Sequence, residues 1–209
     1  MRILSLDIST HTGWSVFDNE RLIEYGKYNI HVSGYKAEIK SYKDYPASYP
    51  KNFIDAANSQ ENKVNELLKL YNPDAVVIEE TNKSRQRFSQ KILEWMHFTV
   101  VSLLLSKNQK FGYITTTCWR KQTNCYMKDW PEYKKWNYKV SQAKKTAKLT
   151  KSGSRVAKIN GKVVSAINQK KLSVILANKY YSLSLELSDD DIADSINLGR
   201  AAVELQLFA

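Results

Sequence analysis

Residues 2–17 of the chain read RILSLDISTHTGWSVF. Residues 2–6 are an apolar run of strand length, residues 8–12 form a polar turn, and residues 13–17 resume a strand pattern. Asp7 therefore ends the first strand, where a carboxylate is costly unless a partner compensates its charge. This stretch predicts a sheet that opens with strands in meander order and carries an acid at one end.

The rest of the chain alternates between helix and strand patterns. We expect strands over 22–31, 75–78 and 111–115, and helices over 53–72, 88–105, 166–181 and 189–207. Alternation of this kind is typical of an α/β sheet that helices cover on both faces. The sequence predicts one domain over residues 1–209.

Two segments interrupt this alternation. Residues 33–51 are rich in Tyr, Lys and Pro, which predicts a loop. Residues 128–165 are expected to form a basic insertion. Within it, Asn160-Gly161 is a hairpin signal, so one small hairpin is expected there.

The positive charge is concentrated in one part of the chain. Residues 133–171 contain twelve Lys and Arg residues and no acidic residue, whereas the whole chain has a net charge of +11. Tyr133, Trp136 and Tyr138 lie among these cations, a pattern that favours a nucleic-acid surface. The expected DNA-binding residues within it are Lys144, Lys145, Lys148, Arg155 and Lys158. The alternative is a solvated loop whose lysines only keep the protein in solution.

Three more acids occupy positions like that of Asp7. Glu79 ends the apolar run 75–78, and Asp191 and Asp194 lie at the start of the last helix. Their spacing of three residues places both side chains on one helix face, where a buried pair of aspartates requires a cation. Asp189 and Asp190 are expected only as helix-start charges that suit the helix dipole.

Four segments, in order along the chain, resemble RuvC-type Holliday junction resolvases of the ribonuclease H-like superfamily. They are LDISTHTGW at 6–14, AVVIEE at 75–80, the strand and basic junction at 111–122, and DIADS at 191–195. The resemblance implies a ribonuclease H-like fold, with a mixed five-stranded sheet and helices on both faces. The insertion is longer than in the compact bacterial enzymes, which suggests a phage, viral or organellar branch.

The resemblance also implies a metal site. Four acids match the family's metal-binding carboxylates, which hold two Mg²⁺ or Mn²⁺ ions: Asp7, Glu79, Asp191 and Asp194. Glu79 matches better than Glu80 because it directly follows Ile78, and Glu80 is the alternative. Lys121 and Lys171 match basic positions near the scissile phosphate.

The roles of the four acids follow from two-metal phosphodiester hydrolysis. We expect Asp7 to bridge both ions and Glu79 and Asp194 to be outer ligands. Asp191 is expected to bind metal or to position the attacking water. Lys121 is expected to act beside these four acids in catalysis.

The resulting hypothesis is a structure-selective endodeoxyribonuclease that resolves four-way or other branched DNA by paired symmetric nicks. Symmetric cutting requires a homodimer, and helix 88–105 is the candidate interface, with a role in the core as the alternative. A nuclease for RNA–DNA hybrids or flaps is a second hypothesis. A phosphate-binding ATPase of the actin and sugar-kinase type is a third, but the chain is short for two lobes and has only seven glycines.

The expected location is a cytosol-like compartment. The longest apolar stretch, 98–105, is too short to span a membrane, and the N-terminus lacks the pattern of a signal peptide. Cys118 and Cys125 have no zinc-ligand companions and are expected as reduced thiols. The cytoplasm of the cell, or of the host for a phage or virus, is therefore predicted, with an organelle as the alternative and no membrane partner.

Overall fold

The computed structural model describes residues 1–32, 50–80, 87–148 and 154–209. The described residues form two compact units, one of Met1–Thr123 with Asp191–Ala209 and one of Asn124–Asp190. The single domain expected from the sequence stays a prediction. The loop expected at 33–51 lies outside the described residues, apart from its last two positions.

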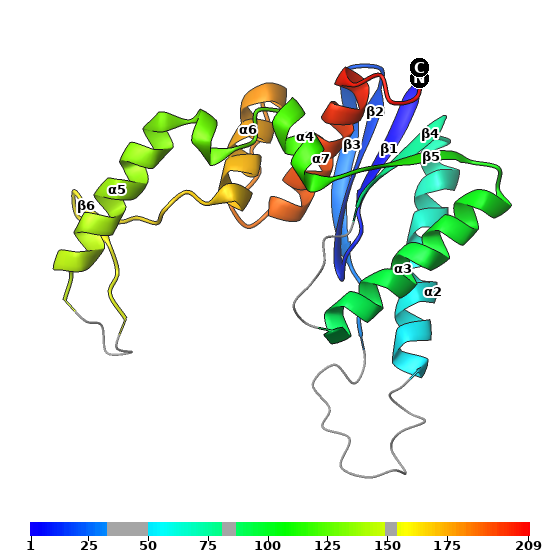
Figure 1. Ribbon diagram of the computed structural model, residues 1–209, viewed down its shortest axis with the longest axis horizontal. Helices are drawn as coiled ribbons and strands as arrows, with labels where there is room; N and C mark the ends of the chain where they lie inside the picture. The colour runs from blue at the N-terminus through cyan, green and yellow to red at the C-terminus, as the bar shows by residue number, and fades with distance from the viewer. Residues whose placement is uncertain (33–49, 81–86, 149–153) are drawn as a thin grey trace, which may run out of the picture. The chain divides into compact units, whose positions relative to one another are not determined.

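The first unit contains a five-stranded sheet in the order β3-β2-β1-β4-β5. The strands are β1 Arg2–Asp7, β2 His11–Asp18, β3 Arg21–Asn29, β4 Ala75–Glu79 and β5 Lys110–Ile114. Pairs β1/β2 and β2/β3 are antiparallel, whereas β1/β4 and β4/β5 are parallel. The expected mixed sheet of five strands, opening with a meander, is confirmed (Figure 1).

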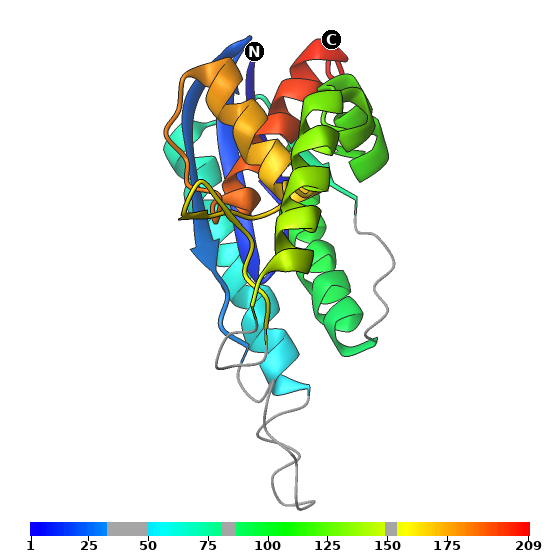
Figure 2. The ribbon, with the colours of Figure 1, turned by 90° about the vertical axis from the view of Figure 1, so that its left-hand side faces the viewer.

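Helices cover both faces of this sheet, as expected. Helices α2 (Lys51–Tyr71) and α3 (Arg87–Ser106) pack on the face that carries Leu4 and Leu6. Helix α7 (Asp190–Glu204) lies on the opposite face, as Figures 1 and 2 show. Both chain termini lie at the same end of the sheet, which is the end where β1 begins.

Helix α7 packs unusually close to β1 and β2. The carbonyl oxygen of Ser195 lies 2.7 Å from the hydroxyl of Ser5 and 3.0 Å from that of Ser15, and the two hydroxyls are 2.5 Å apart. One hydroxyl can donate to the carbonyl while the other donates to its neighbour. A Cβ atom on Gly13 would lie 1.9 Å from the carbonyl oxygen of Asp191, so only glycine fits there.

The second unit contains a helix that the sequence did not predict. Helix α5 (Pro131–Thr146) starts with a proline at its first turn, which suits a helix N-terminus. Val140 is the only buried residue of this helix. The side chain of Asn137 donates to the carbonyl of Ile167 at 2.6 Å and accepts from its N–H at 2.7 Å. So little apolar burial leaves no clear helical period in the sequence.

Short elements complete this unit. The hairpin at Asn160-Gly161 is confirmed, with β6 (Lys158–Ile159) and β7 (Lys162–Val163) joined by two residues at positive φ. A 3₁₀ turn, η2 (Met127–Asp129), precedes α5. Helix α6 (Gln169–Tyr181) begins later than expected, because the side chain of Asn168 accepts from the N–H of Lys171 and caps it. Across the part of the chain that is described, no helix has the length and apolar character to cross a membrane.

Replacing Gly13 by alanine should destabilise the protein. The new Cβ would collide with the backbone of α7, which cannot give way as a flexible side chain does, so we expect a loss of about 2 kcal/mol in the free energy of unfolding. Gly112→Ala is the control in the same sheet, since its Cβ would meet only side-chain atoms, at 3.3 Å or more. Urea unfolding measures both variants, and equal losses would contradict the close packing of α7.

Candidate active site

Asp7 and the backbone of Asp191 both lie next to Gly13. Asp7 ends β1 and is the register partner of Gly13 on β2. The backbone of Asp191, in the first turn of α7, contacts the same glycine. Because glycine has no side chain, the start of α7 can approach the end of β1 at this position.

Glu79 reaches the same end of the sheet from the neighbouring strand. Strands β1 and β4 run parallel, and Leu6 pairs with Ile78. Asp7 and Glu79 each follow directly after this pair, so they lie side by side at the carboxyl ends of adjacent strands. Glu80 is exposed, and its N–H donates to the carbonyl of Ile114 at 2.9 Å.

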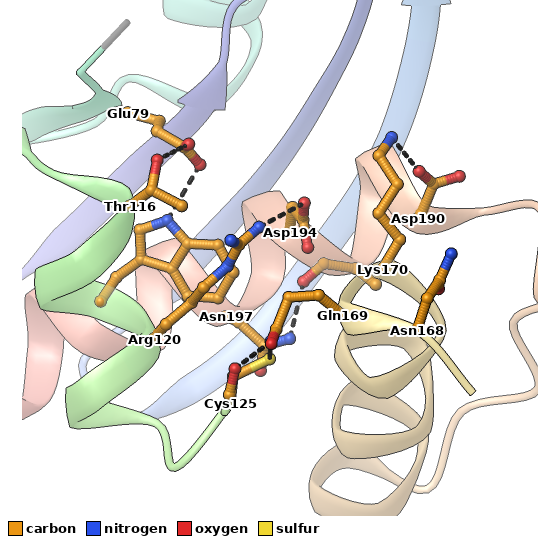
Figure 3. Close-up of polar contacts among 12 residues, drawn as sticks. Glu79, Thr116, Arg120, Cys125, Asn168, Gln169, Lys170, Asp190, Asp194 and Asn197 are labelled. Carbon is orange, nitrogen blue, oxygen red and sulfur yellow. Dashed lines mark hydrogen bonds and ion pairs between the residues drawn. The ribbon is translucent and has the colours of Figure 1, made fainter. Parts of the chain in front are cut away.

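Helix α4 (Thr116–Gln122) supplies two donors to Glu79. The hydroxyl of Thr116 donates to Oε1 of Glu79, and the indole N–H of Trp119 donates to Oε2 at 2.9 Å. Trp119 is completely buried. Figure 3 shows the contact between Thr116 and the carboxylate of Glu79. Each oxygen of Glu79 thus has its own donor from a single helix.

Asp194 faces a cation from the same helix. This aspartate is 6% exposed, and its Oδ2 lies 3.9 Å from Nη2 of Arg120 (Figure 3). The guanidinium of Arg120 also lies over the ring of Trp119, 5.0 Å from its centroid. A buried carboxylate with a cation at this distance is partly compensated in charge.

The four acids suit a hard divalent cation in their chemistry. Carboxylate oxygens are the ligands that Mg²⁺ prefers, and Mn²⁺ accepts the same set. Among the residues that the structure describes, however, no three His, Cys, Asp or Glu side chains gather closely enough to hold a metal ion. Glu79 accepts hydrogen bonds from α4, and Asp194 faces a cation of the same helix. The ligand set therefore stays a prediction.

The expected basic residues lie in both units. Lys121 is exposed in the last turn of α4. Lys171 belongs to the second unit, where its ammonium donates to the hydroxyl of Ser165 at 2.6 Å and to the carbonyl of Ala166 at 3.2 Å. Their roles near a scissile phosphate stay predictions.

The two acids set aside from the site have partners of their own. Asp190 forms an ion pair with Lys170 within the second unit. Asp189 accepts from the N–H of Glu186 at 3.1 Å. Neither contact involves the four candidate ligands.

All five expected DNA-binding cations of the second unit are exposed: Lys144, Lys145, Lys148, Arg155 and Lys158. Lys144 and Lys145 lie in the last turn of α5. Arg155 donates to the carbonyl of Lys145 at 3.2 Å, which ties the segment before the hairpin to the end of α5. Tyr138, also on α5, is 67% exposed, so an aromatic face is available beside the cations.

Sequence reasoning missed the roles of Thr116, Trp119 and Arg120. A local signal existed, because Thr115 follows the strand and its hydroxyl accepts from the N–H of Cys118 at 3.1 Å as a helix cap. A helix starting there turns residues 116 and 119 the same way. Nothing local indicated that they would turn toward Glu79.

No protein-family model matches the chain, and comparison with curated proteins gives no significant match. Comparison with solved structures gives a clear likeness to RuvC of Thermus thermophilus. The structure of that protein in complex with a Holliday junction substrate has a TM-score of 0.59 and 12% identity, over 100% of this chain and 97% of that chain. A second RuvC structure from the same organism has a TM-score of 0.51 and 15% identity, over 99% and 96% of the two chains. The chain therefore has the ribonuclease H-like fold of RuvC, as the resemblance of its motifs predicted.

Proposed function

We propose that the chain is a metal-dependent endonuclease that cuts four-way or other branched DNA by paired symmetric nicks. One observation carries the proposal: Asp7 and Glu79 end adjacent parallel strands while α7 brings Asp191 against the strand partner of Asp7. In this fold, that end of the sheet is the expected place for a phosphodiester-cleaving site. The likeness to a RuvC structure that was determined with a junction substrate supports this choice of substrate.

The chemistry follows from the four acids. Two Mg²⁺ or Mn²⁺ ions, when bound, would neutralise the diester, lower the pKa of an attacking water and stabilise the leaving oxygen. Asp7 would bridge both ions, and Glu79 and Asp194 would complete the ligand set. Asp191 would bind metal or position the attacking water. Lys121 and Lys171 would contact phosphate oxygens near the cut.

A panel of substrates tests this proposal. We expect Mg²⁺-dependent, paired nicks in a labelled four-way junction, and much slower cutting of an RNA–DNA hybrid duplex or a flap. Asp7→Asn should still bind the junction, because its basic surface is intact, but should lose cleavage by at least about 100-fold. Preferential cutting of the hybrid or flap would favour the second hypothesis. A fully active Asp7→Asn variant would refute the metal-site assignment.

We further propose that the exposed cations of the second unit hold the DNA backbone. Phosphate contacts by Lys and Arg give affinity that falls with salt, because each contact releases a counterion. The exposed ring of Tyr138 would add a stacking surface for an unpaired base.

Removing two of these cations should weaken binding measurably. We expect the double change Lys144→Ala and Lys145→Ala to lower junction affinity about tenfold near 0.1 M salt and to reduce the slope of log affinity against log salt. Lys69→Ala with Lys107→Ala is the control, since both lysines are exposed in the first unit and the loss of net charge is the same. Fluorescence anisotropy at several salt concentrations measures both. Equal effects of the two pairs would mean that only net charge matters.

A homodimer is part of the proposal, because two symmetric nicks require two sites. Helix α3 exposes large apolar side chains, with Phe98 74% and Leu105 65% exposed. Phe98 also lines an apolar hollow with Trp95 of α3 and Ile54 of α2. A face of this kind on one unit supports contact with a second copy of the chain.

Phe98→Glu should convert the dimer into a monomer, because a charge would be buried in the contact without a partner. Leu70→Glu is the control, since Leu70 of α2 is 71% exposed and lies outside the hollow. Sedimentation velocity gives the mass of each variant. A wild-type chain that sediments as a monomer at micromolar concentration would refute this interface.

A further inference from the structure

Glu79 is held by two neutral donors from α4. The Thr116 hydroxyl and the Trp119 indole N–H approach different oxygens of the carboxylate. Each carboxylate oxygen has two lone pairs, so it can accept one hydrogen bond and still bind a cation. Thr116 and Trp119 are both buried, which restricts their own rotation. The orientation of Glu79 is therefore set before any metal arrives.

Arg120 holds Asp194 in a different way. Its ion pair spans 3.9 Å, long for a hydrogen-bonded pair, and its Nε is buried without a hydrogen-bond partner among the described residues. The side chain is still 23% exposed. An ion pair so incompletely satisfied costs little to exchange for a stronger cation.

We propose that α4 is a positioning element for the metal centre, with two opposite effects. Thr116 and Trp119 fix the orientation of the Glu79 carboxylate while leaving a lone pair on each oxygen for a cation, and so they raise metal affinity. Arg120 is a built-in counter-cation that compensates Asp194 in the metal-free protein and must release it when metal binds, and so it lowers metal affinity. This inference rests on the proposed metal centre.

The two effects differ in sign for physical reasons. Removing a hydrogen-bond donor that orients a metal ligand typically weakens metal binding about 10- to 100-fold. Removing the positive charge of Arg120 reduces its repulsion of a divalent ion and takes away the counter-charge that it gives to Asp194. Metal binding therefore becomes tighter. If these residues of α4 only packed against the acids, replacing them would not change metal affinity in opposite directions.

Binding of Mn²⁺ to the full-length, DNA-free protein tests the proposal, with free Mn²⁺ counted by electron paramagnetic resonance. We expect Thr116→Val and Trp119→Phe each to raise the Mn²⁺ dissociation constant about tenfold. Thr116→Val keeps the volume of the side chain. It therefore tests the role of the donors even if Trp119→Phe, which removes the indole, unfolds the protein. Urea unfolding of each variant verifies that it is folded.

We expect Arg120→Gln to lower the Mn²⁺ dissociation constant several-fold, and Arg120→Lys to stay close to wild type because the charge remains. Lys107→Gln removes an exposed charge elsewhere in the first unit and controls for net charge. Unchanged binding by folded Thr116→Val would overturn the role assigned to the donors. Weaker binding by Arg120→Gln would overturn the counter-cation.

The proposed metal centre is tested separately from the role of α4. Wild-type protein should bind Mn²⁺ and Asp7→Asn should lose most of that binding, whatever α4 does. If wild type binds no Mn²⁺, both the metal centre and the role of α4 are refuted. If wild type binds and the α4 variants bind equally well, only the role of α4 is refuted.

Discussion

The candidate site depends on how closely α7 can approach the sheet. The Ser195 carbonyl rests on the hydroxyls of Ser5 and Ser15, and Gly13 leaves room for the backbone of Asp191. A second glycine, Gly199, lies where a Cβ would meet Phe17 at 2.5 Å. Without this close contact, α7 and its two acids would lie farther from β1 and β2. The packing of α7 on the sheet thus sets how near its acids lie to the carboxyl ends of β1 and β4.

Bringing acids to one end of a sheet has an electrostatic cost, and α4 supplies part of the compensation. Its Thr116 and Trp119 donate to Glu79, and its Arg120 faces Asp194. These three residues lie within one short helix that begins directly after β5. The acids of the strands and of α7 are consequently not independent, because a shift of α4 changes the surroundings of both at once.

Much of the sheet could be predicted from the sequence, because buried strands leave continuous apolar runs. Residues 2–6 and 75–78 marked β1 and β4 to within one residue, and with them the positions of Asp7 and Glu79. Helix α5 could not be predicted in this way, since it is held largely by polar contacts such as those of Asn137. The bond between Trp119 and Glu79 joins residues forty apart and arises only from tertiary packing. The ligand set itself remains predicted from residue order and fold.

The point where the chain leaves the first unit gives α4 a further significance. Thr123, the last residue before the second unit, is buried, and both its hydroxyl and its N–H bond to the carbonyl of Trp119, at 2.8 and 2.9 Å. The chain re-enters the first unit at Asp191, one of the four acids. The second unit is thus tethered at one end to the residue that holds Glu79 and at the other to the acid-bearing helix. Each covalent link between the two units therefore adjoins a helix that carries or holds a candidate acid, α4 at Thr123 and α7 at Asp191.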